Sequence, residues 1–91
     1  MLRFQLKCSV EEPLDYCWFR SPNGTDYSVS NGGKTINGAI HYAGLGFELG
    51  DCTAEVRVAN KSDAGQWSCY MGTTSGKELQ TTFNVEFKGI Y

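Results

Sequence analysis

The amino-acid sequence predicts an all-β fold of short antiparallel strands that pack as a sandwich or a barrel. Three observations support this prediction. Apolar and polar residues alternate in several short segments, which is the period of two expected of half-buried strands. Turn-forming residues, above all the 11 glycines, separate these segments. The 91 residues are too few to give a second domain its own core, so we expect a single domain over residues 1–91.

The expected elements follow one another without a repeat or a linker. The first strand covers residues 2–8, where apolar and polar side chains alternate. An aromatic-rich strand over residues 16–20 ends at the Ser-Pro-Asn-Gly turn signal of residues 21–24. Glycines within residues 44–50 predict a loop with unusual backbone angles or close packing, and residues 72–77 predict a hairpin connection. The remaining strands are expected at residues 27–29, 40–42, 52–58, 66–71 and 79–87.

Composition and charge exclude two classes of partner. The net charge is −2, from ten acidic and eight basic residues that are interspersed, whereas a nucleic-acid binder would carry a clustered basic face. A mean hydropathy of −0.35 is typical of a soluble globular chain. The longest apolar stretches are only a few residues long. We therefore expect no nucleic-acid partner and no membrane insertion by this segment.

Four cysteines, Cys8, Cys17, Cys52 and Cys69, indicate two disulfides and an extracellular or lumenal location. The alternative is a four-cysteine zinc site, whose ligands come in pairs about two to four residues apart. The gaps here are 9, 35 and 17 residues, which favours disulfides. Four cysteines allow three pairings, and the count alone does not choose among them.

Two Asn-x-Ser/Thr sequons predict a secreted glycoprotein. They are Asn23-Gly24-Thr25 and Asn60-Lys61-Ser62. We expect Asn23 and Asn60 to lie exposed in turns and to carry glycans if the host secretes the chain.

Residues that could support catalysis are scarce, so we expect no enzyme, cofactor or metal. His41 is the single histidine, and the expected disulfides remove the thiol nucleophiles. The acidic residues Glu11, Glu12 and Asp15 fit a solvated loop better than a calcium site. Gly44-Leu45-Gly46 lacks the following helix and lysine of a phosphate-binding loop.

The segment Asp63-Ala64-Gly65-Gln66-Trp67-Ser68-Cys69 resembles the Asp-x-Gly-x-Tyr-x-Cys motif of immunoglobulin-superfamily domains. The resemblance implies an immunoglobulin-like sandwich of two antiparallel sheets. It also implies that Cys8 on strand B pairs across the sandwich with Cys69 on strand F. Trp67 replaces the usual tyrosine, so a ring N–H must supply any hydrogen bond at this corner.

Strand A of such a domain is expected to be short or missing, because only seven residues precede Cys8. An unpaired sheet edge recruits another strand unless charge shields it. Arg3 and Lys7 on the first strand face outward under this prediction. If the native domain has a strand A upstream of Met1, we expect this segment to pair or swap strands with a neighbour.

The second cysteine pair is part of a narrower pattern of cysteines, tyrosines and glycines. Its residues are Tyr16-Cys17, Tyr42-Ala43-Gly44-Leu45-Gly46, Cys52, Gly65-Gln66 and Cys69 through Gly72. This pattern resembles the immunoglobulin domains of insect fasciclin III, a cell-adhesion protein. The resemblance implies a cell-surface adhesion or recognition domain from an arthropod.

Strand parity supports a bridge between Cys17 and Cys52 beside the one implied above. Val56 is expected to face the core, and by the period of two Cys52 does so as well. If Cys17 also points inward, Trp18 points outward. The alternative buries Trp18 as the core tryptophan of ordinary immunoglobulin domains, which leaves Cys17 and Cys52 on opposite faces. We favour the inward cysteine.

An inward Cys17 predicts one outward patch on the neighbouring strands C and F. Tyrosine, tryptophan and arginine are enriched at binding hot spots, because they bury large areas and keep a polar end. The predicted partner-binding residues are Tyr16, Trp18 and Arg20 on strand C and Gln66, Ser68 and Tyr70 on strand F.

The predicted function is therefore an extracellular protein-recognition module at the cell surface. Cell–cell adhesion is favoured, either homophilic, with a possible homodimer, or with another immunoglobulin-type protein. The alternative is a soluble secreted protein of immune or carrier type that captures a ligand.

Overall fold

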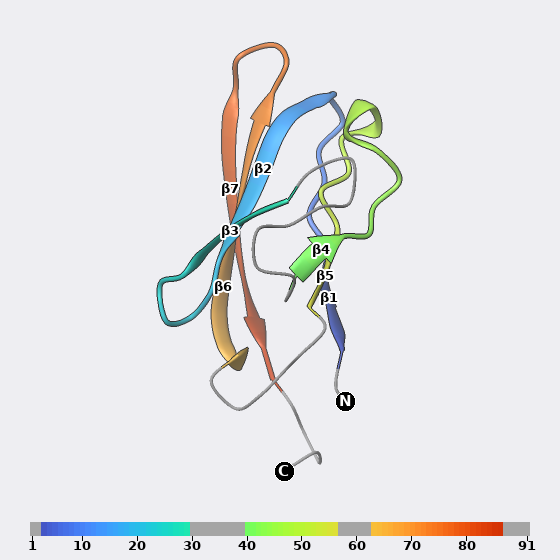
Figure 1. Cartoon of the computed structure of the whole chain (residues 1–91). Helices are drawn as coiled ribbons and strands as arrows, with labels where there is room; N and C mark the ends of the chain where they lie inside the picture. Colours follow the sequence, from blue (N-terminus) through green and yellow to red (C-terminus); the bar gives the residue numbers. More distant parts are fainter. Residues whose placement is uncertain (1–2, 30–39, 57–62, 87–91) are drawn as a thin grey trace.

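Two antiparallel sheets lie face to face and contain all strands of the part of the chain described by the computed structural model, residues 3–29, 40–56 and 63–86 (Figure 1). This confirms the predicted antiparallel two-sheet sandwich. The smaller sheet has the order β1-β5-β4, made by Phe4–Leu6, Ala54–Val56 and Ile40–Tyr42. The larger sheet has the order β3-β2-β6-β7, made by Asp26–Val29, Leu14–Arg20, Gly65–Thr73 and Glu78–Val85.

The strand boundaries differ from the prediction at two informative places. β2 begins two residues earlier than expected and contains an irregularity, because Leu14 pairs with Thr73 whereas Tyr16 pairs with Gly72. Asp15 is therefore an extra residue, as in a β-bulge. β6 continues to Thr73, so the connection to β7 is shorter than the predicted residues 72–77. The expected strand ends at residues 2, 57–58 and 87 lie outside the described residues.

Both predicted disulfides are present and cross between the sheets. Cys8 follows β1 and is bonded to Cys69 in β6. Cys17 in β2 is bonded to Cys52, two residues before β5. All four cysteines are buried, and Phe19 beside them is fully buried. The inward orientation of Cys17 is thus confirmed.

The core tryptophan is Trp67 in β6, only 1% exposed. Its ring packs against the rings of Phe4 and Tyr27, with centroids 5.9 and 6.2 Å away. Its Nε1–H donates a 2.8 Å hydrogen bond to the backbone carbonyl of Asp63, which is the ring N–H bond predicted for this corner. Trp18 lies on the opposite, outer face of the larger sheet and is half-buried, so it is not the core tryptophan.

The glycine-rich loop between β4 and β5 adopts the unusual backbone angles expected of it. Gly46 and Gly50 have φ values of 128° and 75°. Between them lies a single 3₁₀ turn, η1, over Phe47–Leu49. The Tyr42 hydroxyl fixes the loop, because it donates to the carbonyl of Asp51 at 2.6 Å and accepts from the Gly46 N–H at 2.7 Å. No helix among the described residues has the length and apolar character needed to cross a membrane.

Candidate functional site

The six predicted partner-binding residues lie on the outer face of the larger sheet, on its two central strands β2 and β6. In the register between these strands, Trp18 is opposite Tyr70, Arg20 is opposite Ser68, and Tyr16 is opposite Gly72. Gln66 continues the same face of β6 and is exposed. The buried side chains of β2 and β6 alternate with these positions, so the disulfides in the core fix which side chains point outward.

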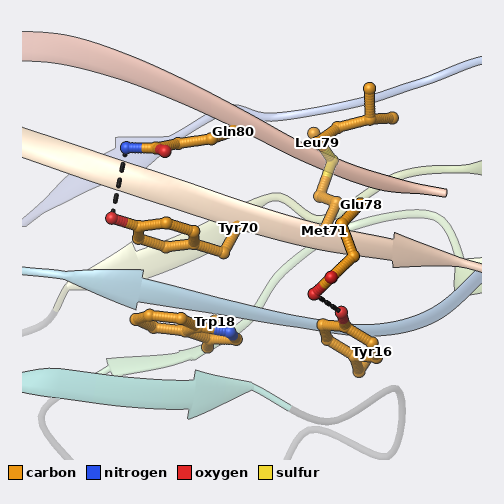
Figure 2. A pocket seen from close by; sticks show the side chains of 7 residues that line it. All are labelled: Tyr16, Trp18, Tyr70, Met71, Glu78, Leu79 and Gln80. Carbon is orange, nitrogen blue, oxygen red and sulfur yellow. Dashed lines mark hydrogen bonds between the residues drawn. The ribbon is translucent and has the colours of Figure 1, made fainter.

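Trp18 and Tyr70 stack against each other across the two strands (Figure 2). Their ring centroids are 4.0 Å apart and their planes differ by 10°. The Arg20 guanidinium lies 5.2 Å from the Trp18 ring and 5.5 Å from the Tyr70 ring, within the range of cation–π attraction. We refer to Trp18, Tyr70 and Arg20 as the stacked cluster.

Asp26 on β3 holds the guanidinium of the stacked cluster in place. Its carboxylate accepts hydrogen bonds from Arg20 Nε at 2.8 Å and from Arg20 Nη2 at 3.3 Å. This two-point contact fixes the plane of the guanidinium as well as its position. The bond from Arg20 lowers the pKa of the Asp26 carboxyl below its ordinary value, and the same contact raises the pKa of Arg20.

We expect the Arg20→Gln substitution to raise the pKa of Asp26 toward its ordinary value. Because the folded-state pKa of Asp26 is lowered, the pair stabilises the fold fully above the ordinary carboxyl pKa of about 4. That contribution is lost as the pH falls through the lower folded-state pKa. A carboxyl ¹³C NMR titration of both proteins measures the shift. An unchanged Asp26 titration in the variant would contradict the assigned contact.

Tyr16 forms one end of the outer face. Its ring covers Gly72 closely enough that a Cβ at this position would overlap the ring, which explains the glycine in the middle of a long strand. The Tyr16 hydroxyl donates a 2.6 Å hydrogen bond to the Glu78 carboxylate (Figure 2). This bond raises the pKa of the Tyr16 phenol above its ordinary value.

Two shallow hollows flank the stacked cluster. One, of about 240 Å³, lies against Tyr16, Trp18 and Tyr70 and is bordered on β7 by Glu78, Leu79 and Gln80 (Figure 2). The Gln80 amide donates a 3.1 Å hydrogen bond to the Tyr70 hydroxyl. The other hollow, of about 350 Å³, is lined in part by Arg20, Gln66, Ser68 and Thr82. The face thus alternates aromatic surface with carboxylate, amide and hydroxyl groups.

The residues of the outer strands that complete this face were not among the predicted binding residues. Asp26 comes from β3, and Glu78 and Gln80 come from β7. The outward residues of β7 could have been predicted from the sequence, because the same alternation that places Phe83 inward places Gln80 and Thr82 outward. Asp26 could not have been predicted in this way, since the alternation does not give the register between β2 and β3 that places Asp26 opposite Arg20.

Of the two asparagines predicted to carry glycans, one lies in the described part of the chain. Asn23 is exposed in the turn after β2, as predicted, and its Oδ1 accepts hydrogen bonds from Ser21 Oγ and from the N–H and Oγ1 of Thr25. Asn60 lies outside the described residues.

Two of the other titratable candidates, Glu12 and His41, make contacts away from the stacked cluster. Glu12 accepts hydrogen bonds from Lys77 Nζ at 2.9 Å and from Ser75 Oγ at 2.7 Å, which ties the β1–β2 loop to the β6–β7 turn. The bond from Lys77 is the main cause of a lowered pKa for Glu12. His41 on β4 places Nε2 3.5 Å from the Glu55 carboxylate on β5.

No model of a known protein family matches this chain, and no curated protein matches it either. Its function is inferred from the residues and geometry of the outer face.

Proposed function

We propose that this chain is an extracellular protein-recognition module of immunoglobulin type that binds a protein partner through the outer face of β2 and β6. The observation that carries the proposal is the stacked cluster. Trp18, Tyr70 and Arg20 are held together outside the core, although a folded domain gains more by burying such large side chains. These residue types dominate binding hot spots, where a rigid side chain loses little entropy on binding.

The strand order supports the immunoglobulin assignment. If β1 to β7 are equated with strands B, C, C′, D, E, F and G, the sheets become B-E-D and C′-C-F-G, which is the immunoglobulin arrangement without strand A. Cys8 and Cys69 then form the B–F bridge. The bond from Trp67 to Asp63 replaces that of the corner tyrosine.

The two disulfides support an extracellular or cell-surface location, since such bonds persist in oxidising environments. The exposed Asn23 sequon supports a glycoprotein. Together with the resemblance to insect fasciclin III, these features favour cell–cell adhesion, either homophilic or with another immunoglobulin-type protein.

The shape of the outer face favours a protein partner over a small ligand. Pockets that enclose small ligands have volumes of about 300–1,000 Å³ and bury most of the ligand. The two hollows beside the stacked cluster measure about 240 and 350 Å³, and both lie open on the face of the sheet, so neither would enclose most of a ligand. A broad face of this kind suits a protein surface, so the soluble carrier is the less favoured alternative.

Trp18→Ala is expected to weaken partner binding by about 30-fold or more, equivalent to about 2 kcal/mol. The fold should stay intact, with a stability loss below about 1.5 kcal/mol, because only a surface aromatic pair is lost. Aggregation of beads coated with the protein measures homophilic binding. Binding of the protein to cells of its source tissue measures binding to another receptor.

Ser28→Ala is the matched control, because Ser28 lies opposite Trp18 on the same face but outside the stacked cluster. It should bind as the wild type does. If Trp18→Ala bound as well as the control, the outer face would not be the binding site. A stability loss of about 3–5 kcal/mol would instead give Trp18 a core role.

A further inference from the structure

β7 is an eight-residue strand, Glu78–Val85, that is paired along one edge only. It pairs with β6 over eight consecutive residue pairs without a register shift. In the described ranges no strand pairs with its other edge, which lies at the side of the larger sheet (Figure 1). Every second residue of an antiparallel strand directs its N–H and C=O away from the paired neighbour. β7 therefore presents a regular row of backbone donors and acceptors.

This edge lacks the features that keep other edge strands from pairing. Natural edges are protected by lysines, prolines, bulges or shortness. β7 contains no proline, lysine or arginine, and its only charged residue is Glu78 at one end. β1, the edge strand of the smaller sheet, has only three residues and is flanked by Arg3 and Lys7. Among the edge strands of the described residues, β7 has eight residues against three or four for β1, β3 and β4, so it is the edge most open to pairing.

The inner face of β7 is also poorly covered. Leu79 and Thr81 lie opposite the buried Met71 and Cys69 and point to the same side of the sheet. Leu79 nevertheless remains 38% exposed, and Thr81 is exposed as well. β3 and β7 are the two edges of the larger sheet, and β4 and β1 are the two edges of the smaller sheet. Because β4 contacts β3, β1 is the strand of the smaller sheet that lies nearest to β7. No described strand lies beyond β1 to cover the inner face of β7. The sandwich is open beside Leu79 and Thr81, whereas Phe83 and Val85 further along β7 are partly buried against the core.

We propose that the free edge of β7 pairs antiparallel with β7 of a second copy of this chain. Two four-stranded sheets would then join into one eight-stranded sheet about a twofold axis. An axis normal to the sheet keeps both inner faces on the same side, so apolar side chains meet apolar side chains. The inference is independent of the proposed function, because the outer face stays accessible.

Pairing over the greatest length of β7 leaves two registers, one centred on Thr81 and one on Thr82, and charge distinguishes between them. With Thr81 on the twofold axis, Leu79 lies opposite Phe83 of the second copy and Glu78 lies opposite Asn84 of the second copy. No like charges then meet. Centring the axis on Thr82 would place Glu78 opposite Glu86 of the second copy, and directly opposed like charges destabilise a sheet. The Thr81-centred register is therefore the favoured one.

Charge reversal at the twofold axis tests the proposal. Thr81 would face its own copy, so Thr81→Lys and Thr81→Glu should each raise the dimer dissociation constant at least about tenfold. An equimolar mixture of the two should associate again, because lysine then opposes glutamate. Sedimentation velocity of the full chain over a concentration range measures all four samples, and thermal melting confirms that the exposed site tolerates both changes.

Thr82→Lys is the matched control. It adds the same positive charge to the same strand, but in the proposed register residue 82 lies opposite the uncharged Gln80 of the second copy and not opposite its own counterpart. Its dissociation constant should stay within about threefold of the wild type. Trp18→Ala should still form the dimer that Thr81→Lys loses, because Trp18 lies on the outer face of β2 and not at the edge of β7. A wild-type chain that is monomeric at its highest soluble concentration would overturn the proposal. So would Thr81→Lys dimerising as the wild type does, or a mixture that fails to associate.

Discussion

Trp67→Ala is expected to lower the free energy of unfolding by about 3–5 kcal/mol, the usual cost of deleting a fully buried aromatic side chain. Trp67 is 1% exposed and packs against Phe4 and Tyr27 from the two sheets. Its loss removes these contacts and the hydrogen bond from the indole N–H to the Asp63 carbonyl. Since domains of this size are stable by only about 5–15 kcal/mol, the loss is large. Denaturant unfolding, with disulfides intact, measures it.

Trp67→Phe separates the hydrogen bond from the packing. Phenylalanine keeps most of the apolar ring but cannot donate to Asp63, so we expect a smaller cost of about 1–3 kcal/mol. Equal losses in the alanine and phenylalanine variants would contradict a mainly packing role. The two tryptophans should therefore differ in what their loss affects. Trp18→Ala should weaken partner binding and leave the fold intact, whereas Trp67→Ala should lower the free energy of unfolding.

The second large effect concerns the disulfides, which are removed as pairs so that no cysteine is left unpaired. In the chain-entropy model, a bridge stabilises by restricting the unfolded chain, and longer loops gain more. We expect Cys8→Ala/Cys69→Ala, with a separation of 61 residues, to cost roughly 4 kcal/mol. Cys17→Ala/Cys52→Ala, with a separation of 35, should cost a few tenths of a kcal/mol less.

Equilibrium unfolding of both double variants beside the wild type measures these costs. The two bridges are equally buried, so each variant serves as the packing control of the other. A loss below about 1 kcal/mol for either pair would contradict a stabilising role for that bridge. A Cys17/Cys52 variant that is much less stable than the other would show that loop length does not set the order.

Alternation along the chain predicted the fold because burial imposes the same period of two on every strand. Val56 and Cys52 had to share a face, and a bridge to Cys52 then required Cys17 to point inward. That one constraint turned Trp18 outward and brought it onto the same face as Tyr70, which the register confirms. The core and the orientation of the candidate site could thus be derived from the sequence.

The remaining features depend on register and on tertiary cover, which local alternation does not encode. The contact between Arg20 and Asp26 exists because the β2–β3 turn sets these residues opposite each other. The bulge at Asp15 similarly changes which residue of β6 meets Tyr16. Leu79 alternates as a core residue does, yet it stays exposed because the smaller sheet does not reach over it. The alternation identifies the inward face and not whether another layer covers it.

The bridge between Cys8 and Cys69 also determines how the domain would carry mechanical tension. A force that pulls on the chain from both sides would pass from Cys8 through the sulfur atoms directly to Cys69, 61 positions further along. The residues between them, which include β2 with Trp18 and Arg20 of the stacked cluster, lie outside this covalent load path. Their extension, roughly 200 Å for a chain of that length, is unavailable while the bond is intact. In the proposed recognition face, the side chains contributed by β2 would therefore be shielded from tension, whereas Tyr70, one residue after Cys69, would lie in the loaded part of the chain.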